Sequence, residues 1–236
     1  MDIGNGYEQH VEVMKQLKMT DSFYEVREPY KEDFEEIYNK AKDEKVTISS
    51  AKDFLNSLSK EELNTLQHHT LLVNDINVNS LSDEGAYNLL LHHYEQYDFD
   101  KDGFVSTGEG KSMSWLPTNM PNKEKEVLVE TLNELDEKDR FQSLLMLVPL
   151  KFHQTGTGFT VAQNNDAMDY SAIMDRLDNL LNPTPPAYTS SELKNSLSLF
   201  KELFEKKFDE YSEQNEQNRS IKDREAQLSK ARITAR

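Results

Sequence analysis

The sequence predicts a mostly α-helical protein in which a multi-helix domain is followed by one long amphipathic helix. Three observations support this prediction. Apolar residues recur three and four positions apart along most of the chain, which is the spacing of one helix face. Ser, Thr, Asn and Asp precede these periodic runs, as helix N-caps do. Most of the 7 prolines fall between the runs.

Four helices are expected in the first third of the chain, over Glu8–Lys18, Pro29–Lys42, Ser50–Leu58 and Ser59–His69. In the second of these, Phe34, Ile37 and Tyr38 share one face. Ser59 and Glu62 have the spacing of a capping box, which fixes the start of the fourth. Residues 46–48 are expected to be extended between the second and third helices.

A fifth helix is expected from Ser82 to Tyr97, because Tyr87, Leu90, Leu91 and Tyr94 lie three and four positions apart. It leads directly into the dodecapeptide 98–109. A short helix should follow Glu109 and end before Pro117, since Gly110 weakens its start and proline stops a helix.

The dodecapeptide reads Asp-Phe-Asp-Lys-Asp-Gly-Phe-Val-Ser-Thr-Gly-Glu and fills every specified position of the pattern D-x-D-x-D-G-x5-E. A hard divalent cation takes six to eight oxygen ligands, and this loop offers oxygens in order. Gly103 stands where the chain must turn sharply with positive φ. The expected metal ligands are the carboxylates of Asp98, Asp100 and Asp102, the carbonyl of Phe104, Ser106 or a water that it holds, and a bidentate Glu109.

With the helical pattern that leads into it, this loop resembles an EF-hand, the calcium-binding helix-loop-helix family. The resemblance covers residues 82–117 and implies Ca²⁺ as the cofactor. Hands of this family normally pair face to face, but only one loop here matches. Residues 31–58 have a helix-loop-helix pattern and are a candidate pseudo-hand, that is, a hand that binds no metal but pairs with the matching one. Ile48 would make the strand contact between the two loops. Pairing across a dimer and a hand that stands alone are the alternatives.

The second half of the chain is also expected to be helical, over Asn122–Leu135, Glu137–Leu150 and Asp166–Leu181, with a loop or short strand at Thr155–Val161. Three prolines mark residues 183–189 as a stiff linker. The long helix of residues 190–236 carries an apolar stripe, formed by Leu193, Leu197, Phe200, Phe204 and Tyr211. We expect the stripe to dock on its own domain, with self-association or a partner helix as alternatives.

The predicted organisation is therefore a helical domain over 1–182, a proline-rich linker and a long helix with a basic, polar tail. The domain contains the hand and the candidate pseudo-hand. In the tail, residues 219–236 hold six basic and two acidic side chains, whereas the whole chain has a net charge of -16. Such acidity argues against nucleic-acid binding, which requires a positive surface.

Several other classes of protein are excluded or disfavoured by composition. Without cysteine there is no disulfide, thiolate metal site or cysteine nucleophile. The sequence contains no apolar run long enough to span a membrane and no classical signal peptide. A cytoplasmic location is the expectation, and export without a classical signal peptide stays open.

Other motifs carry less weight. On a helix, the neighbouring residues of the pairs His68–His69 and His92–His93 diverge by about 100°, so neither pair chelates one ion readily. We interpret them as partly exposed helix residues. Residues 105–112 resemble a phosphate-binding loop only in part, because Val105 replaces its first glycine. No catalytic motif is present.

We therefore expect a non-enzymatic calcium-binding protein in which the ion stabilises or modulates a helical protein-interaction surface. By resemblance to the family, a sensor would expose Met113, Trp115 and Leu116 on binding calcium, whereas the short exiting helix favours a structural site. The alternative is a helical assembly or adaptor protein that acts through its C-terminal helix, as a homodimer or with a protein partner, and in which calcium is incidental. An enzyme whose site is built from distant residues is the third hypothesis.

Overall fold

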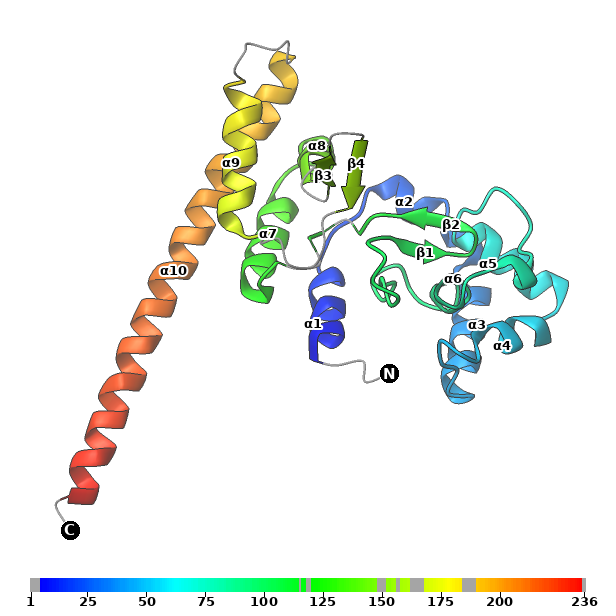
Figure 1. Ribbon diagram of the computed structural model, residues 1–236, viewed down its shortest axis with the longest axis horizontal. Coiled ribbons are helices and arrows are strands. Elements are labelled where there is room, and N and C mark those ends of the chain that lie inside the picture. Colours follow the sequence, from blue (N-terminus) through cyan, green and yellow to red (C-terminus); the bar gives the residue numbers. More distant parts are fainter. Residues whose placement is uncertain are drawn as a thin grey trace.

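The computed structural model describes residues 5–114, 116–117, 120–147, 152–155, 158–161, 168–183 and 190–234. For residues 5, 152–155, 158–161 and 218–234 it describes the backbone alone. The protein is mostly helical and ends in a long helix, as predicted (Figure 1). Trp115, most of the expected linker and the side chains of the basic tail lie outside the described residues.

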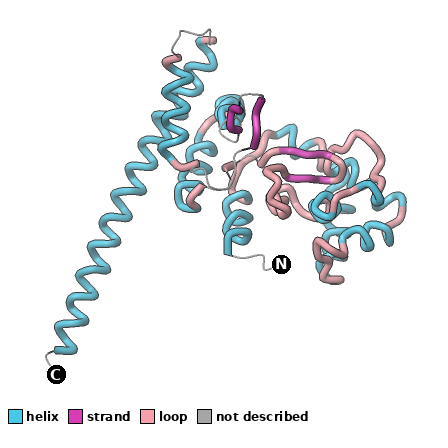
Figure 2. The backbone as a smooth tube through the Cα atoms, in the orientation of Figure 1, coloured by secondary structure: helices cyan, strands magenta, loops and turns pink. Residues whose placement is uncertain are grey.

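Helices make up most of the chain, and the described strands form two short hairpins (Figure 2). The helices are α1 (Asn5–Met14), α2 (Asp21–Glu25), η1 (Glu28–Tyr30), α3 (Lys31–Asp43), α4 (Ala51–Ser57), α5 (Lys60–His69), η2 (Val78–Ser80), α6 (Asp83–Asn88), α7 (Asn122–Glu134), α8 (Glu137–Leu147), α9 (Tyr170–Leu181) and α10 (Ser191–Thr234). Strands β1 (Val105–Thr107) and β2 (Gly110–Ser112) pair antiparallel, and so do β3 (Phe152–Thr155) and β4 (Gly158–Val161).

In the described part of the chain, no helix combines the length and the apolarity that crossing a bilayer requires.

The first hydrophobic core is formed by α3, α4, α5 and α6. Phe34 and Ile37 of α3 are buried in it, as their shared helix face predicts, together with Leu55 of α4 and Leu66 of α5. The capping box at the start of α5 is also confirmed: the Glu62 backbone N–H donates to the Ser59 hydroxyl, and the Ser59 N–H donates to the Glu62 carboxylate. Residues 46–47 have no regular secondary structure and residues 48–50 form a turn, so no strand is formed at 46–48.

The second hydrophobic core joins α1 to α7, α8, α9 and α10, although α1 comes from the other end of the chain. Leu197, Phe200 and Phe204 of α10 are fully buried against it, so the apolar stripe docks on its own protein. The Ser190 hydroxyl accepts the Leu193 N–H and caps the helix. Beyond this packed portion α10 continues away from the body (Figure 1).

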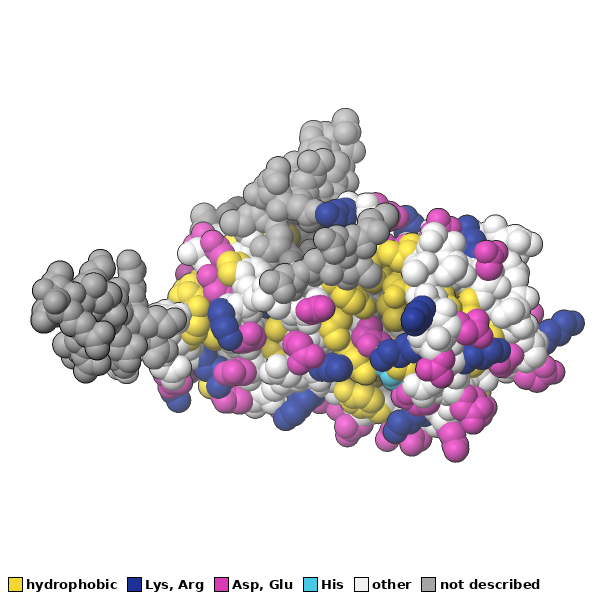
Figure 3. Space-filling view, turned by 90° about the horizontal axis from the view of Figure 1, so that it is seen from below, with side chains coloured by type: hydrophobic (Ala, Val, Ile, Leu, Met, Phe, Trp, Pro, Cys, Tyr) yellow, Lys and Arg dark blue, Asp and Glu magenta, His cyan; other side chains and the backbone are white. Residues whose placement is uncertain are grey.

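Apolar side chains collect in a central band when the molecule is viewed from below, and charged side chains of both signs surround them (Figure 3). Interspersed charges of this kind are typical of a solvated surface, and the described part of this face shows no extended basic patch.

The predicted helix from Ser82 to Tyr97 is wrong beyond Asn88, where α6 ends. Leu89 and Leu90 are both buried, and neighbouring residues of a helix point about 100° apart, so the apolar run fits a buried turn as well as a helix. The fully buried Asn88 amide stabilises the turn: its Nδ2 donates to the carbonyls of Tyr97 (3.0 Å) and Ser106 (2.7 Å). These contacts lie 9 and 18 residues away in sequence and leave no local signal.

The short exiting helix after Glu109 is also not formed. Residues 110–112 are strand β2, and Val105 pairs with Ser112 in the hairpin. Gly110 favours this outcome because glycine weakens a helix start. The hairpin lies against α6, where the Gly108 N–H donates to the Gly85 carbonyl at 2.9 Å.

Gly85 allows α6 and the hairpin to approach this closely. A Cβ atom at Gly85 would lie 2.3 Å from the Gly108 carbonyl oxygen, well inside van der Waals contact. We therefore predict that Gly85→Ala destabilises the protein by about 1–3 kcal/mol, because backbone must move to admit the methyl group. Urea denaturation with chelator present would measure this free energy.

Gly6→Ala is the matched control for this prediction. Gly6 also lies in a helix, and a Cβ there would meet nothing within 4 Å. Alanine should leave stability unchanged or raise it by about 0.4–1 kcal/mol. If Gly85→Ala behaved like Gly6→Ala, the close packing of α6 on the hairpin would be incorrect.

Candidate metal centre

The buried carboxylate of Glu84 organises the loop that begins at Asp98. Glu84 is 2% exposed, and its Oε2 accepts the backbone N–H groups of Phe99 (2.6 Å) and Asp100 (3.0 Å). Its Oε1 accepts the N–H of Ser106 at 2.7 Å, at the far side of the loop. Helix α6 therefore holds both ends of the turning segment through one side chain.

The aspartates close the loop on itself through backbone hydrogen bonds. Asp98 accepts the N–H groups of Asp102 (3.1 Å) and Gly103 (2.9 Å) on its two oxygens. Asp100 also accepts from Asp102, at 3.0 Å. Gly103 has φ of 92°, as the sequence pattern predicts, and Lys101 also adopts a positive φ of 62°. The loop thus has a defined turn in which the carboxylates lie close to the backbone.

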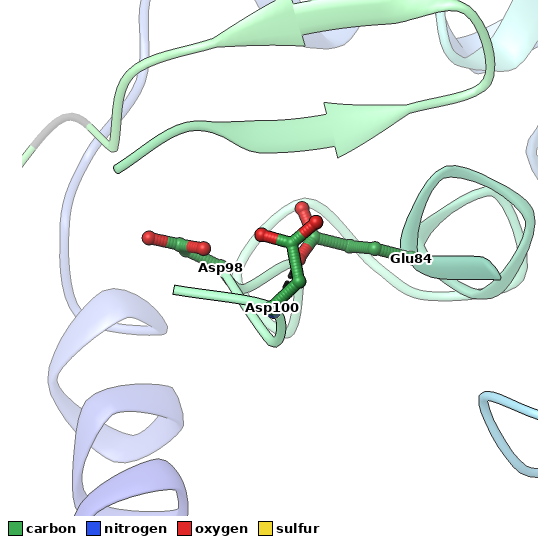
Figure 4. A group of neighbouring side chains, drawn as sticks. All are labelled: Glu84, Asp98 and Asp100. Atoms are coloured by element: carbon green, nitrogen blue, oxygen red, sulfur yellow. Dashed lines mark hydrogen bonds between the residues drawn. The ribbon is translucent and has the colours of Figure 1, made fainter. Parts of the chain in front are cut away.

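Three carboxylates converge in this turn. Glu84, Asp98 and Asp100 each offer an oxygen within 4.8 Å of the others, an arrangement that could hold a metal ion. Figure 4 shows Glu84 extending from α6 toward Asp100, with Asp98 on the other side. Burial raises the pKa of Glu84 and of Asp98, and the neighbouring aspartate charges raise both further. A cation at this position would offset both effects.

Two expected ligands point to other partners. The Asp102 Oδ2 accepts from Lys111 Nζ at 2.7 Å, and this contact lowers the pKa of Asp102. Glu109 lies in the turn between β1 and β2, where its carboxylate accepts the Ser80 hydroxyl. Both side chains are exposed, so the contacts with Lys111 and Ser80 are surface contacts that cost little to break. The Asp102 Oδ1 also accepts the Phe104 N–H at 2.8 Å, within the loop.

Ser106 is the expected ligand whose surroundings are most unusual. It is 2% exposed, and its hydroxyl oxygen has no hydrogen-bond partner in the described part of the protein. A buried hydroxyl without a partner costs about 1–3 kcal/mol. Because the Ser106 N–H bonds to Glu84, this orphaned oxygen belongs to the same segment as the carboxylate cluster. The residues present therefore fit a cation that prefers oxygen ligands.

Glu84 was missed by sequence reasoning because it precedes the loop and belongs to no loop motif. The sequence feature that could have indicated its burial is its position between Leu81 and Ala86, both of which are buried. An acidic residue flanked by core positions must find compensating donors, and here the donors are loop N–H groups.

Pairing of the loop with the candidate pseudo-hand is not seen in the described strands. Residues 31–58 form helix α3, a turn and helix α4, as their pattern predicts. The eighth loop residue, Val105, pairs with Ser112 of its own hairpin. The expected strand contact through Ile48 is therefore wrong for the described part of the chain.

His68 and His69 lie in helix α5, the first exposed and the second partly exposed, as expected, whereas the second histidine pair departs from the expectation of helix residues. His92 and His93 lie outside any helix, with His93 in a turn, and with His69 they are partly buried among aromatic rings. Burial lowers the pKa of His10, His69 and His93 to about 4 each; Lys125 contributes at His10, and Arg27 at the other two. These three imidazoles are neutral at neutral pH.

A scan against protein-family models, a search of curated proteins and a search of solved structures each found no match to this chain. The geometry of the loop and its carboxylates therefore carries the functional argument.

The buried histidines predict a loss of stability in mild acid. Between about pH 6.5 and about pH 4 the unfolded chain binds protons that the folded His10, His69 and His93 do not, so unfolding takes up protons and the free energy of unfolding falls as pH falls. Urea denaturation in chelator from about pH 7.5 to about pH 5 should show this loss.

His10→Gln isolates one contribution. Its slope of unfolding free energy against pH should fall by about one proton relative to wild type. Asn64→Gln, on the exposed face of α5, removes no titrating group and should leave the slope unchanged. The raised pKa values of Glu84 and Asp98 make the folded state more stable as pH falls, which opposes the effect of the histidines. This contribution is the same in all three proteins. Equal slopes for all three would contradict a neutral, buried His10.

Proposed function

We propose that the chain binds a divalent cation in the loop 98–109, with calcium as the preferred ion, and that it acts without catalysis. The convergence of Glu84, Asp98 and Asp100 carries this proposal. All three donors are carboxylate oxygens, which suit hard cations, and neither histidine nor cysteine takes part. The resemblance of the loop to an EF-hand supports the same ion.

The donor set favours calcium over magnesium. Magnesium requires near-ideal octahedral geometry and gives up its waters reluctantly. Here the carboxylates already accept backbone N–H groups, so their positions are fixed by the turn. A larger ion with irregular coordination fits such a pre-set group better. The Phe104 carbonyl, the Ser106 hydroxyl, Asp102 and Glu109 are the further ligands that the sequence pattern offers.

The proposed role of the ion is to hold α6, the loop and the hairpin together. The hairpin is bonded to α6 at Gly85, and Leu116, soon after it, is fully buried in the second core. A cation that orders the loop would therefore stabilise the segment that connects the two cores, which consists of the loop, the β1–β2 hairpin and the residues up to Leu116. Leu116 is one of the residues that a sensor would have to expose, and its burial favours a structural role.

The test is calorimetric titration of calcium into chelator-stripped protein. We expect one site, and an increase in unfolding free energy of about 2.7 kcal/mol when calcium is at a hundredfold excess over its dissociation constant. Asp100→Asn keeps the shape and the Asp102 hydrogen bond but removes the charge, and should weaken binding about tenfold or more. Magnesium should bind more weakly.

Glu61→Gln is the charge-matched control, because Glu61 is exposed on α5 and should leave calcium binding unchanged. Glu109→Gln should weaken binding less than Asp100→Asn, since Glu109 is bonded to Ser80. The reverse order would show that Glu109 leaves Ser80 to complete the site. No saturable calcium response below about millimolar would defeat the proposal.

A second candidate function is assembly through the C-terminal helical region, with calcium incidental. Its support is apolar exposure on two helices that pack together: Phe141 and Leu145 of α8 are 44% and 48% exposed, and Leu199 of α10 is 42% exposed. Phe141 and Leu145 are four residues apart and share a helix face. A second copy or a partner helix could cover them.

This alternative predicts concentration-dependent mass. Light scattering should show a dimer of wild type at high concentration, and Leu145→Glu should remain monomeric, because a buried charge opposes apolar contact. Val73→Glu is the control, since Val73 is 93% exposed in a different part of the protein. A wild-type protein that stays monomeric at all concentrations would exclude self-association.

A further inference from the structure

A cavity of about 420 Å³ lies between the β1–β2 hairpin, the end of α5 and the segment of α2 and η1. Its described lining includes Arg27, Lys111, His69 and His93 but neither aspartate nor glutamate. The whole chain has 43 acidic residues, so a sizeable cavity lined without one has an unusual charge balance. The lining predicts a site that favours negative charge.

Arg27 is the positive charge that defines this cavity. Its Nη1 donates to the Phe23 carbonyl at 2.7 Å, and its guanidinium carbon lies 3.6 Å from the centre of the Phe23 ring. Among the described residues, no carboxylate forms an ion pair with it. Burial lowers its pKa, yet a guanidinium stays charged in proteins. A held, partly desolvated cation with free donors is the usual partner of a carboxylate.

The other basic groups add polarity without adding a second free charge. Lys111 is paired with Asp102 at 2.7 Å. His69 and His93 are neutral, and the buried His69 Nδ1 has no hydrogen-bond partner in the described part of the protein. The cavity therefore presents one uncompensated positive charge, which matches a ligand with a single negative charge better than a dianion.

The remaining walls are apolar. Leu72, Leu91, Val105 and Met113 line the cavity, and Leu71 is 53% exposed beside them. Leu71 thus extends the apolar surface at the edge of the cavity, where an apolar ligand would contact it. A ligand matched to this lining has a hydrocarbon body and one anionic head.

We propose that this cavity binds a small organic carboxylate whose head pairs with Arg27 and whose apolar body lies against the leucine side of the lining. No loop carboxylate lines the site, and the two are connected through Lys111, which lies in the cavity lining and pairs with the loop residue Asp102. Titration in the presence of chelator therefore tests the cavity while that pair is intact. The cavity has the features of a ligand pocket, namely a mostly apolar wall and a few polar groups that fix orientation.

The test compares octanoate with 1-octanol, which have equal chain length and differ in the charge of the head. Calorimetric titration in the presence of chelator should show one octanoate site and binding at least about tenfold weaker for octanol. Arg27→Met should weaken octanoate binding about tenfold or more and leave octanol binding unchanged. Arg27→Lys, which keeps the charge but loses the planar fork, should fall between the two.

Lys31→Met is the matched control, because it removes one positive charge from an exposed residue that does not line the cavity. It should bind octanoate as wild type does. Circular dichroism confirms that each variant is folded. The proposal is overturned if octanoate shows no saturable binding, if octanol binds equally well, or if folded Arg27→Met binds octanoate as tightly as wild type.

Discussion

The buried carboxylate of Glu84 is the contact on which the functional region depends. A charge at 2% exposure is costly unless donors surround it, and the donors here are three backbone N–H groups of the loop. The same hydrogen bonds place Asp98 and Asp100 beside Glu84, which concentrates negative charge at one point. The Glu84 carboxylate therefore sets the loop conformation, and the negative charges that it brings together repel one another unless a cation neutralises them. This is the physical basis of the proposed calcium site.

The hairpin β1–β2 places this site at the junction of the two cores. On one side it is bonded to α6 in the first core, and beyond it the chain enters the second core at Leu116. The aromatic rings of Tyr7 and His10 on α1 pack on Tyr97, and the Tyr7 hydroxyl donates to the Glu95 carbonyl at 2.9 Å. Hairpin residues also line the cavity that contains Arg27. If ligands at the two sites influence each other through the hairpin, that influence must be reciprocal.

Much of the fold follows from local sequence patterns, whereas the exact site does not. Phe34 and Ile37 at helical spacing, the Ser59–Glu62 capping box and the stripe of Leu197, Phe200 and Phe204 each act within one element, so the sequence shows them directly. The positive φ of Gly103 is local in the same way. Glu84 and Asn88 act through contacts to residues 9 to 22 positions away, and such contacts override helical periodicity without leaving a motif. For this reason the entering helix was predicted too long, and Glu84 was absent from the expected ligands.

The length of α10 also affects how the molecule moves in solution. Its 44 residues span about 66 Å at 1.5 Å per residue. A compact chain of 236 residues has a radius of gyration of only about 17–18 Å. A monomer with such a projection diffuses more slowly than a sphere of 27.4 kDa. Its elution from a sizing column would therefore imitate a larger particle even when each molecule is alone.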